Sequence, residues 1–427
     1  MNFQDFLLNL FSYFCFYLGG FLIWPSKRNI PALIQIPFFI SAILIPLIAI
    51  DHSIRFTDQE ISTLTLINFL GASSLIFGIV TGKILKIHKY IFFIKFYNSI
   101  ISLIASNKNK ITKLVVYLFT ACLVLSFCYL YMGFIPILAE EPMTAKYFKG
   151  AYKSRYDDIA VLFRFFQSIL FIAIPVSFLF LFQKIKSSNK LILILLCFWA
   201  ILMFVINLYR GPVLSGLILV ASLFAAKSSI KTLFFITFIT ALYCFGSLIF
   251  IFLGINEYPS NFSFLNEVSK GQPDIQDHLI FLSKFITYPT YSYGLTFFGA
   301  LVPGNYEYNP AVYILNIVNP NSLIENIVSG GFRMTVYLHA FMAFSWIGTA
   351  FFSFLYGLLL TRYTLIFKNL NNKSIYNLGL NTLWFMFIAM IFLKFYHLKY
   401  QDIITGFFLI LILGSEIKIS LNGTTKK

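Results

Sequence analysis

The feature that most constrains the fold is a series of apolar runs that recurs along the whole chain. The hydrocarbon core of a bilayer is about 30 Å thick, and a helix needs roughly 20 apolar residues to cross it. Because 59% of the 427 residues are hydrophobic and only 11% are charged, a soluble globule is excluded. The sequence therefore predicts an all-α polytopic membrane protein.

A window reading predicts about eleven spans, at residues 6–24, 31–50, 61–82, 114–138, 159–182, 191–208, 213–226, 232–253, 336–360, 378–393 and 403–413. They divide the chain into an N-terminal bundle of about eight spans (1–253), a large loop (254–335), and C-terminal helices with a tail (336–427). Residues 90–105 are also apolar, but a span there would reverse the side of Lys27 and Arg28. We therefore expect an interfacial helix at 90–105 on the cytoplasmic leaflet.

The charges give the bundle an orientation. One set of loops and the C-terminal tail carry 20 Lys and Arg and one acid, whereas the opposite side carries 11 Lys and Arg and 15 acids. Positively charged loops stay in the cytoplasm, so the N-terminus and the large loop are predicted to be extracytoplasmic. The net charge of +16 is thus an orientation signal, and no nucleic-acid partner is expected.

The large loop is the longest segment that does not read as a plain membrane helix. Prolines, Asn-Pro pairs and Gly-Gly interrupt it, which predicts turns and short helices. Its many Tyr, Phe, Leu and Ile residues argue against disorder, and a long ordered loop is usually functional. We expect this loop to carry the chemistry.

Two arginines mark the outer ends of spans. Arg164 lies about one turn inside its span, in AVLFRFFQS, where it either binds a partner or extends to the interface. Arg210 lies in the tight outer turn INLYRGPVLSG, where Gly211 and Pro212 break the helix. Both cations are candidates for function.

A third cluster follows the large loop. Arg333 and Tyr337 are four residues apart and are predicted to share a helix face, and His339 lies about one turn inside the next span. Within the loop, Asp274, Asp277 and His278 resemble a weak metal site, but a solvated helix face is the preferred interpretation. No cofactor and no metal are expected, because the five cysteines lack metal-ligand spacing.

These residues suggest a chemistry. Guanidinium groups bind phosphate and diphosphate oxygens in a bidentate manner, and a nearby histidine can take a proton from a sugar hydroxyl. Loop tyrosines can stack on sugar rings. The predicted substrate-binding residues are Arg164, Tyr337, His278 and Tyr291.

At this point the chain resembles the bacterial oligosaccharide repeat-unit polymerases, the Wzy-type O-antigen and capsule polymerases. It shares with them ten or more spans, a short outer turn with an Arg, and a large late extracytoplasmic loop. The family pattern E-x-Y-x-x-F-G-x-x-G after that loop corresponds here to His339, Phe341, Phe344, Ser345 and Gly348. A Phe and the last Gly match, whereas the family's Glu is replaced by His and one Gly by Ser.

The resemblance implies a metal-independent glycosyltransferase of GT-C-like architecture in the bacterial cytoplasmic membrane. Such an enzyme moves a growing glycan from undecaprenyl diphosphate onto a lipid-linked repeat unit at the extracytoplasmic face. Arg210 and Arg333 would stabilise the leaving diphosphate, and His339, or secondly Glu325, would be the base. A chain-length regulator and a flippase are the protein partners that the resemblance implies.

Two other functions remain open. O-antigen ligase chemistry uses the same donor and the same face, and the residues do not separate it from polymerisation. A lipid-linked oligosaccharide flippase would be expected to lack the large loop and to line a central cavity with cations. Among the candidate cations only Arg164 lies inside a predicted span, and the large loop is present, which disfavours the flippase.

Overall fold

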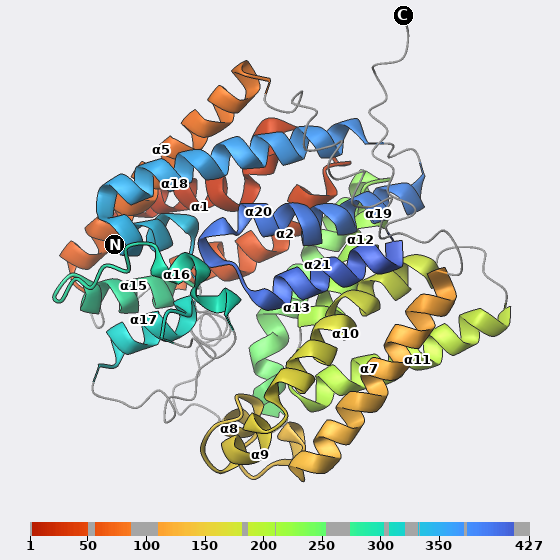
Figure 1. Cartoon of the computed structure of the whole chain (residues 1–427). Helices are drawn as coiled ribbons and strands as arrows, with labels where there is room; N and C mark the ends of the chain where they lie inside the picture. Colours follow the sequence, from red (N-terminus) through yellow and green to blue (C-terminus); the bar gives the residue numbers. More distant parts are fainter. Residues whose placement is uncertain are drawn as a thin grey trace, which may run out of the picture.

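The computed structural model describes residues 2–49, 56–86, 110–181, 187–209, 211–252, 274–302, 307–320, 332, 334–370 and 374–413. Every secondary-structure element within these ranges is a helix (Figure 1). The bundle consists of α1 (Phe3–Ile23), α2 (Ile30–Phe39), η1 (Ile40–Leu44), α3 (Ile45–Ala49), α5 (Asp58–Ile84), α7 (Lys110–Met132), α10 (Ala160–Leu181), α11 (Ser187–Ile206), α12 (Gly211–Ala225), α13 (Ser229–Phe252), α18 (Val336–Asn369), α19 (Ile375–Trp384), η7 (Phe385–Ala389), α20 (Met390–Leu393) and α21 (Tyr400–Leu413).

Eight helical segments among the described residues are long and apolar enough to cross a membrane. They are Phe3–Ile23, Ile30–Ala49, Asp58–Ile84, Lys110–Leu138, Ala160–Leu181, Asn189–Ile206, Val336–Asn369 and Ile375–Leu393. The prediction of a polytopic helical membrane protein is therefore confirmed. Three shorter apolar helices, Val213–Ala225, Ser229–Cys244 and Tyr400–Ile412, occupy the positions of the other predicted spans. The total of eleven stays a prediction, and the interfacial helix at 90–105 lies outside the described residues.

Apolar side chains cover the outside of the bundle. Phe77, Leu195, Leu233 and Ile347 are each at least 60% exposed, at positions spread over four different helices. A water-soluble protein rarely leaves so much apolar surface uncovered, whereas a lipid-facing surface requires it.

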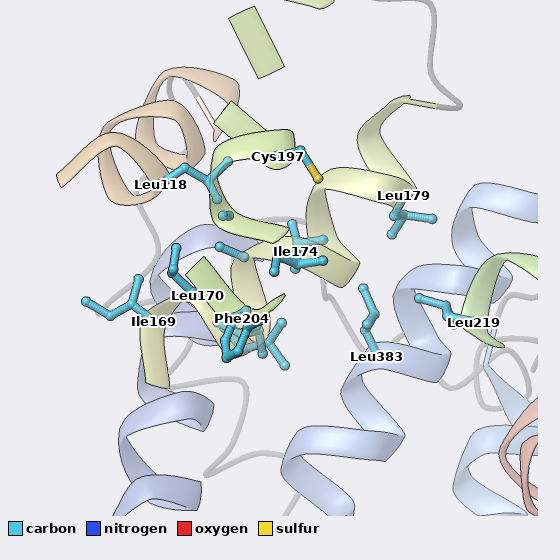
Figure 2. Packing of buried hydrophobic residues seen from close by; sticks show 14 of the residues in the cluster. Leu118, Ile169, Leu170, Ile174, Leu179, Cys197, Phe204, Leu219 and Leu383 are labelled. Carbon is cyan, nitrogen blue, oxygen red and sulfur yellow. The ribbon is translucent and has the colours of Figure 1, made fainter. Parts of the chain in front are cut away.

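Two hydrophobic clusters hold the bundle together. In the first, α10 is surrounded by α7, α11, α12, α19 and α21, and Figure 2 shows its side chains Leu170 and Ile174 among those of its neighbours. In the second, α1, α5 and α18 pack with the helices of the large loop. The C-terminal helices thus pack into the N-terminal bundle: α19 and α21 join the first cluster, and α18 joins the second and, through Phe367, also the first.

The α5–α18 contact is the closest crossing in the second cluster. A Cβ atom on Gly78 would collide with the carbonyl oxygen of Phe354, and one on Gly357 would collide with that of Leu75. Only glycines permit backbones to approach this closely in a membrane. α5 begins with a capping box, in which Thr57 and Glu60 satisfy each other's backbone N–H groups.

The described part of the large loop contains α15 (Asp274–Phe285), α16 (Leu295–Phe298), η5 (Gly299–Leu301) and α17 (Pro310–Val318). The prediction of turns and short helices is confirmed for these residues. α15 packs against α5, η1 and α3, and α17 packs against α15. The loop helices gather at the end of the bundle where α1 begins (Figure 1).

The chain reverses direction inside α18. Phe344 and Ser345 have non-helical dihedral angles, with Ser345 at φ 58° and ψ −149°. The hydroxyl of Thr349 donates to the carbonyl of Tyr337 at 3.3 Å, and Gly348 lies directly against the carbonyl of Ala340. In a straight helix these pairs would be about 12–18 Å apart at 1.5 Å per residue. Residues 336–343, the entry arm, therefore fold back against residues 346–369, the long arm.

This hairpin corrects the prediction of an uninterrupted span at 336–360. The long arm is about 36 Å in length at 1.5 Å per residue, so it can cross the membrane alone. The entry arm ends beneath the large loop, where the N–H groups of Ser292 and Tyr293 donate to the carbonyls of Met342 and Ala343 at 3.1 and 3.2 Å. These bonds satisfy carbonyls that a helix C-terminus leaves unpaired.

Candidate functional site

Three histidines from three distant parts of the chain meet at the entry arm. His339 lies in the first turn of α18, one turn after the N-cap Thr335, and is 1% exposed. Its ring centroid is 5.4 Å from that of His397 in η8 (Phe395–His397). His278 of α15 is 2% exposed and acts electrostatically on His339. The other two histidines of the sequence, His52 and His88, lie outside the described residues.

His278 is anchored to the N-terminal helix. Its Nδ1 atom is 2.6 Å from the hydroxyl of Tyr13, and the two rings stack with centroids 5.8 Å apart. Tyr13 is fully buried in α1. This contact ties the large loop to the bundle, and it gives His278 a partner other than the predicted substrate. Asp277 and His278 are both buried, so the predicted solvated helix face is wrong for these two residues.

Two ring nitrogens of the cluster lack partners. Within the described residues, neither Nδ1 of His339 nor Nε2 of His397 makes a hydrogen bond, although both atoms are buried. Buried polar atoms are nearly always paired, so an orphan atom is expected to have a functional reason or an absent partner. The two atoms lie on neighbouring rings.

The surroundings of His397 disfavour its charged form. Burial lowers the pKa of this imidazole, and electrostatic interactions with Lys399, His339 and Lys394 lower it further. Burial likewise lowers the pKa of Lys399, whereas Asp402 opposes that shift. His397 is therefore neutral at pH 7.

A cavity of about 240 Å³ adjoins the cluster. It lies between α1, α2, α18 and α20, and its walls are largely apolar, with Phe16, Leu360 and Leu393 among them. Lys394 provides a positive charge on one wall. Tyr396 lines the cavity, and its ring centroid is 5.5 Å from that of His339. The apolar cavity and the histidines thus share one side chain as a common wall.

Tyr337 is a packing residue and not the predicted substrate contact. Its ring is completely buried against Gly71, and its hydroxyl donates to the carbonyl of Ser12 at 3.3 Å. Tyr337 lies in the first turn of α18, whereas Arg333 lies outside the described residues, so the helix face that the two were predicted to share stays a prediction.

The loop tyrosines divide between packing and exposure. Tyr291 is half-buried, with its ring edge-on to Phe285 at 5.3 Å and tilted against Tyr293 at 6.3 Å. Tyr288 and Tyr293 are 78% and 73% exposed. These two rings remain accessible for stacking on a sugar, and the ring of Tyr291 packs against that of Tyr293.

Arg164 belongs to a different part of the molecule. Its Nε donates to the hydroxyl of Tyr156 at 2.7 Å, and Tyr156 and Phe163 belong to the first hydrophobic cluster, whereas the entry arm belongs to the second. Arg164 was predicted either to bind a partner or to extend to the interface, and the hydrogen bond to Tyr156 shows that it has a partner. The predicted convergence of Arg164 with His339 is not seen.

Arg164 instead acts on the residue that precedes Arg210. Burial and the charge of Tyr147 raise the pKa of Tyr209, and Arg164 lowers it. Arg164 and Tyr209 are therefore neighbours. Arg210, Arg333 and Glu325 themselves lie outside the described residues, so their predicted roles stay predictions.

Three residues of this region, His397, Tyr396 and Tyr13, were not predicted from the sequence. His397 lies in KFYHLK, a short turn between two predicted spans, with a lysine two positions after it. Its position in an outer turn could have identified His397 as a candidate, in the same way that Arg210 was identified from its turn. Tyr13 gives no comparable signal, because a tyrosine within an apolar run is an ordinary packing residue.

Within the described residues, no group of three or more His, Cys, Asp or Glu side chains is arranged to hold a metal ion. The comparisons with known proteins assign no relatives: no family model, no curated protein and no solved structure matches this chain.

Proposed function

We propose that this protein polymerises lipid-linked oligosaccharide repeat units into a bacterial surface polysaccharide. The donor is a glycan on undecaprenyl diphosphate, the acceptor is a further lipid-linked repeat unit, and the reaction takes place at the extracytoplasmic face of the cytoplasmic membrane. A chain-length regulator and a flippase are the proposed protein partners.

The observation that carries the proposal is the buried His339, whose Nδ1 has no hydrogen-bond partner among the described residues and which lies near an apolar cavity in a membrane bundle. A lipid-linked sugar needs apolar volume for its chain next to a polar group that can act on its sugar. The shared wall at Tyr396 brings these two environments together. The exposed Tyr288 and Tyr293 of the large loop add aromatic faces suited to sugar rings.

In the proposed reaction, Nδ1 of His339 takes the proton of an acceptor hydroxyl. The hydroxyl oxygen bonds to the anomeric carbon of the donor glycan as the bond from that carbon to the diphosphate breaks. The electron pair of the broken bond leaves with the lipid diphosphate. Arg210 and Arg333 are the proposed partners of that anion, and Glu325 is the second candidate base.

The α18 hairpin supports the alignment that places His339 at the family's Glu. The family pattern has glycines at the positions of Ser345 and Gly348. Ser345 has a positive φ that glycine adopts at low cost, and Gly348 lies where a Cβ would collide with the carbonyl of Ala340. Both positions of the pattern thus meet a backbone requirement of the reversal in direction.

The deciding experiment is a deletion of the gene in its host, with the surface glycan resolved by gel electrophoresis. We expect the ladder of long chains to collapse to a single repeat unit on its acceptor, and His339→Ala to fail to restore it. Loss of even the single unit would instead indicate a ligase or a flippase. An unchanged ladder would contradict the glycan assignment altogether.

A further inference from the structure

His397 is a second histidine of the site, which the sequence did not single out. It reaches the entry arm from η8, a short 3-10 helix held by a hydrogen bond from the N–H of Leu398 to the carbonyl of Phe297 in the large loop at 3.3 Å. Phe297 itself packs edge-on to Phe352 of the long arm and against Phe395 of η8. The loop, the hairpin and η8 therefore fix the position of His397 together.

The orphan nitrogens of the two rings define the ligand. A centroid separation of 5.4 Å is short enough for one oxygen to lie within about 2.8–3.0 Å of a nitrogen on each ring when both nitrogens face the gap between the rings. Nδ1 of His339 and Nε2 of His397 are the ring nitrogens that lack a partner in the part of the chain that the structure describes. A group that both accepts and donates a hydrogen bond satisfies one acceptor and one donor nitrogen, and an alcohol hydroxyl is such a group.

We propose that the acceptor sugar hydroxyl binds between Nδ1 of His339 and Nε2 of His397, which makes His397 a second catalytic residue; this inference rests on the proposed function. His397 donates the proton on Nε2 in a hydrogen bond to the hydroxyl oxygen. The hydroxyl gives its own proton to His339 as its oxygen bonds to the anomeric carbon. The proton on His397 stays in place, and the leaving electron pair goes to the diphosphate.

The charges around His397 keep it suited to this role. Lys394 and Lys399 on its own segment and His339 on the entry arm disfavour its protonation, and Asp402 of α21 is paired electrostatically with Lys399. His278, which acts electrostatically on His339, forms a hydrogen-bonded pair with Tyr13. A neutral His397 donates from Nε2 without repelling the proton that His339 receives.

Two isosteric substitutions test the assignment, because glutamine places its amide near the ε position of histidine and asparagine near the δ position. We expect His397→Gln to keep the ratio of polymerised glycan to single repeat units within about threefold of wild type in the complemented deletion strain. His397→Asn and His397→Leu should each lower it at least tenfold, since losing one donor at a reacting atom costs about 10²–10³-fold in rate. Equal activity of the glutamine and asparagine variants, at matched protein level, would overturn the inference.

A second measurement does not depend on glycan synthesis. The full chain is labelled with ¹⁵N-histidine, placed in nanodiscs and titrated by NMR, with each imidazole assigned from its own substitution. We expect the His397 signal to stay neutral through pH 6 and to shift when His339 is replaced by Asn. A His397 signal that is unchanged by His339→Asn would overturn the inference, whatever the result of the glycan assay. An unchanged glycan ladder on gene deletion, with the two rings still coupled, would contradict the proposed function alone.

Discussion

At the scale of single residues, the hydrogen bonding of buried polar atoms separates the chemical candidates from the structural ones. Tyr337 and His339 are two positions apart and both fully buried, yet the hydroxyl of Tyr337 donates a hydrogen bond to the backbone carbonyl of Ser12. Nδ1 of His339 has no partner among the described residues. A buried polar atom that is satisfied stabilises the fold, and one that is unsatisfied costs free energy unless a ligand binds it.

The neutral state of His397 makes stability depend on pH. Its pKa in the folded protein is below the ordinary value of 6.5, so the unfolded chain binds more protons below that pH. Acidification from pH 7.5 to 5 should therefore lower the melting temperature in detergent, and the loss should be smaller by about 2–4 °C in His397→Gln. Identical acid sensitivity of the two proteins would contradict a depressed pKa.

At the scale of elements, the hairpin in α18 is the decisive feature, because it separates the short entry arm that carries His339 from the long arm. Its turn uses a serine at a positive φ with an extended ψ, a region that residues with a side chain occupy only under strain. Gly348 then permits the two arms to touch.

The two hairpin positions respond oppositely to substitution. Ser345→Gly should stabilise the protein by about 1 kcal/mol because it relieves the positive φ, whereas Gly348→Ala should destabilise it by about 1–3 kcal/mol through overpacking. Ser353→Gly is the matched control, since Ser353 lies in the long arm and glycine within a helix costs roughly 0.5–1 kcal/mol. Melting temperatures of the three variants in detergent measure these effects. Destabilisation by Ser345→Gly equal to that of Ser353→Gly would argue against the turn.

At the scale of the whole molecule, the bundle has two packing centres. α10 organises one, with Arg164 near its start, and the α5–α18 crossing organises the other, with the histidines at one end. The large loop joins only the second centre within the described residues, through α15 and α17. The candidate base and Arg164 are thereby held on different parts of the bundle.

The orientation of the bundle is testable with single cysteines, because all five native cysteines are buried. Tyr288 in the large loop and Lys227 in the turn between α12 and α13 are both exposed. In spheroplasts, a membrane-impermeant maleimide should label Tyr288→Cys at least tenfold faster than Lys227→Cys, since basic loops stay in the cytoplasm. Permeabilisation should equalise the two rates. Faster labelling of Lys227→Cys in intact spheroplasts would invert the predicted topology.

The sequence by itself determined the class of protein, the approximate position of the spans, and the start of α18 at Val336. These features are local, because apolar length and helix caps are properties of neighbouring residues. Tertiary packing alone brings Tyr13 against His278 and His339 against His397, places Arg164 in another part of the bundle, and folds α18 back. Such contacts depend on how helices far apart in the chain pack, and hydrophobic periodicity does not specify which helices become neighbours.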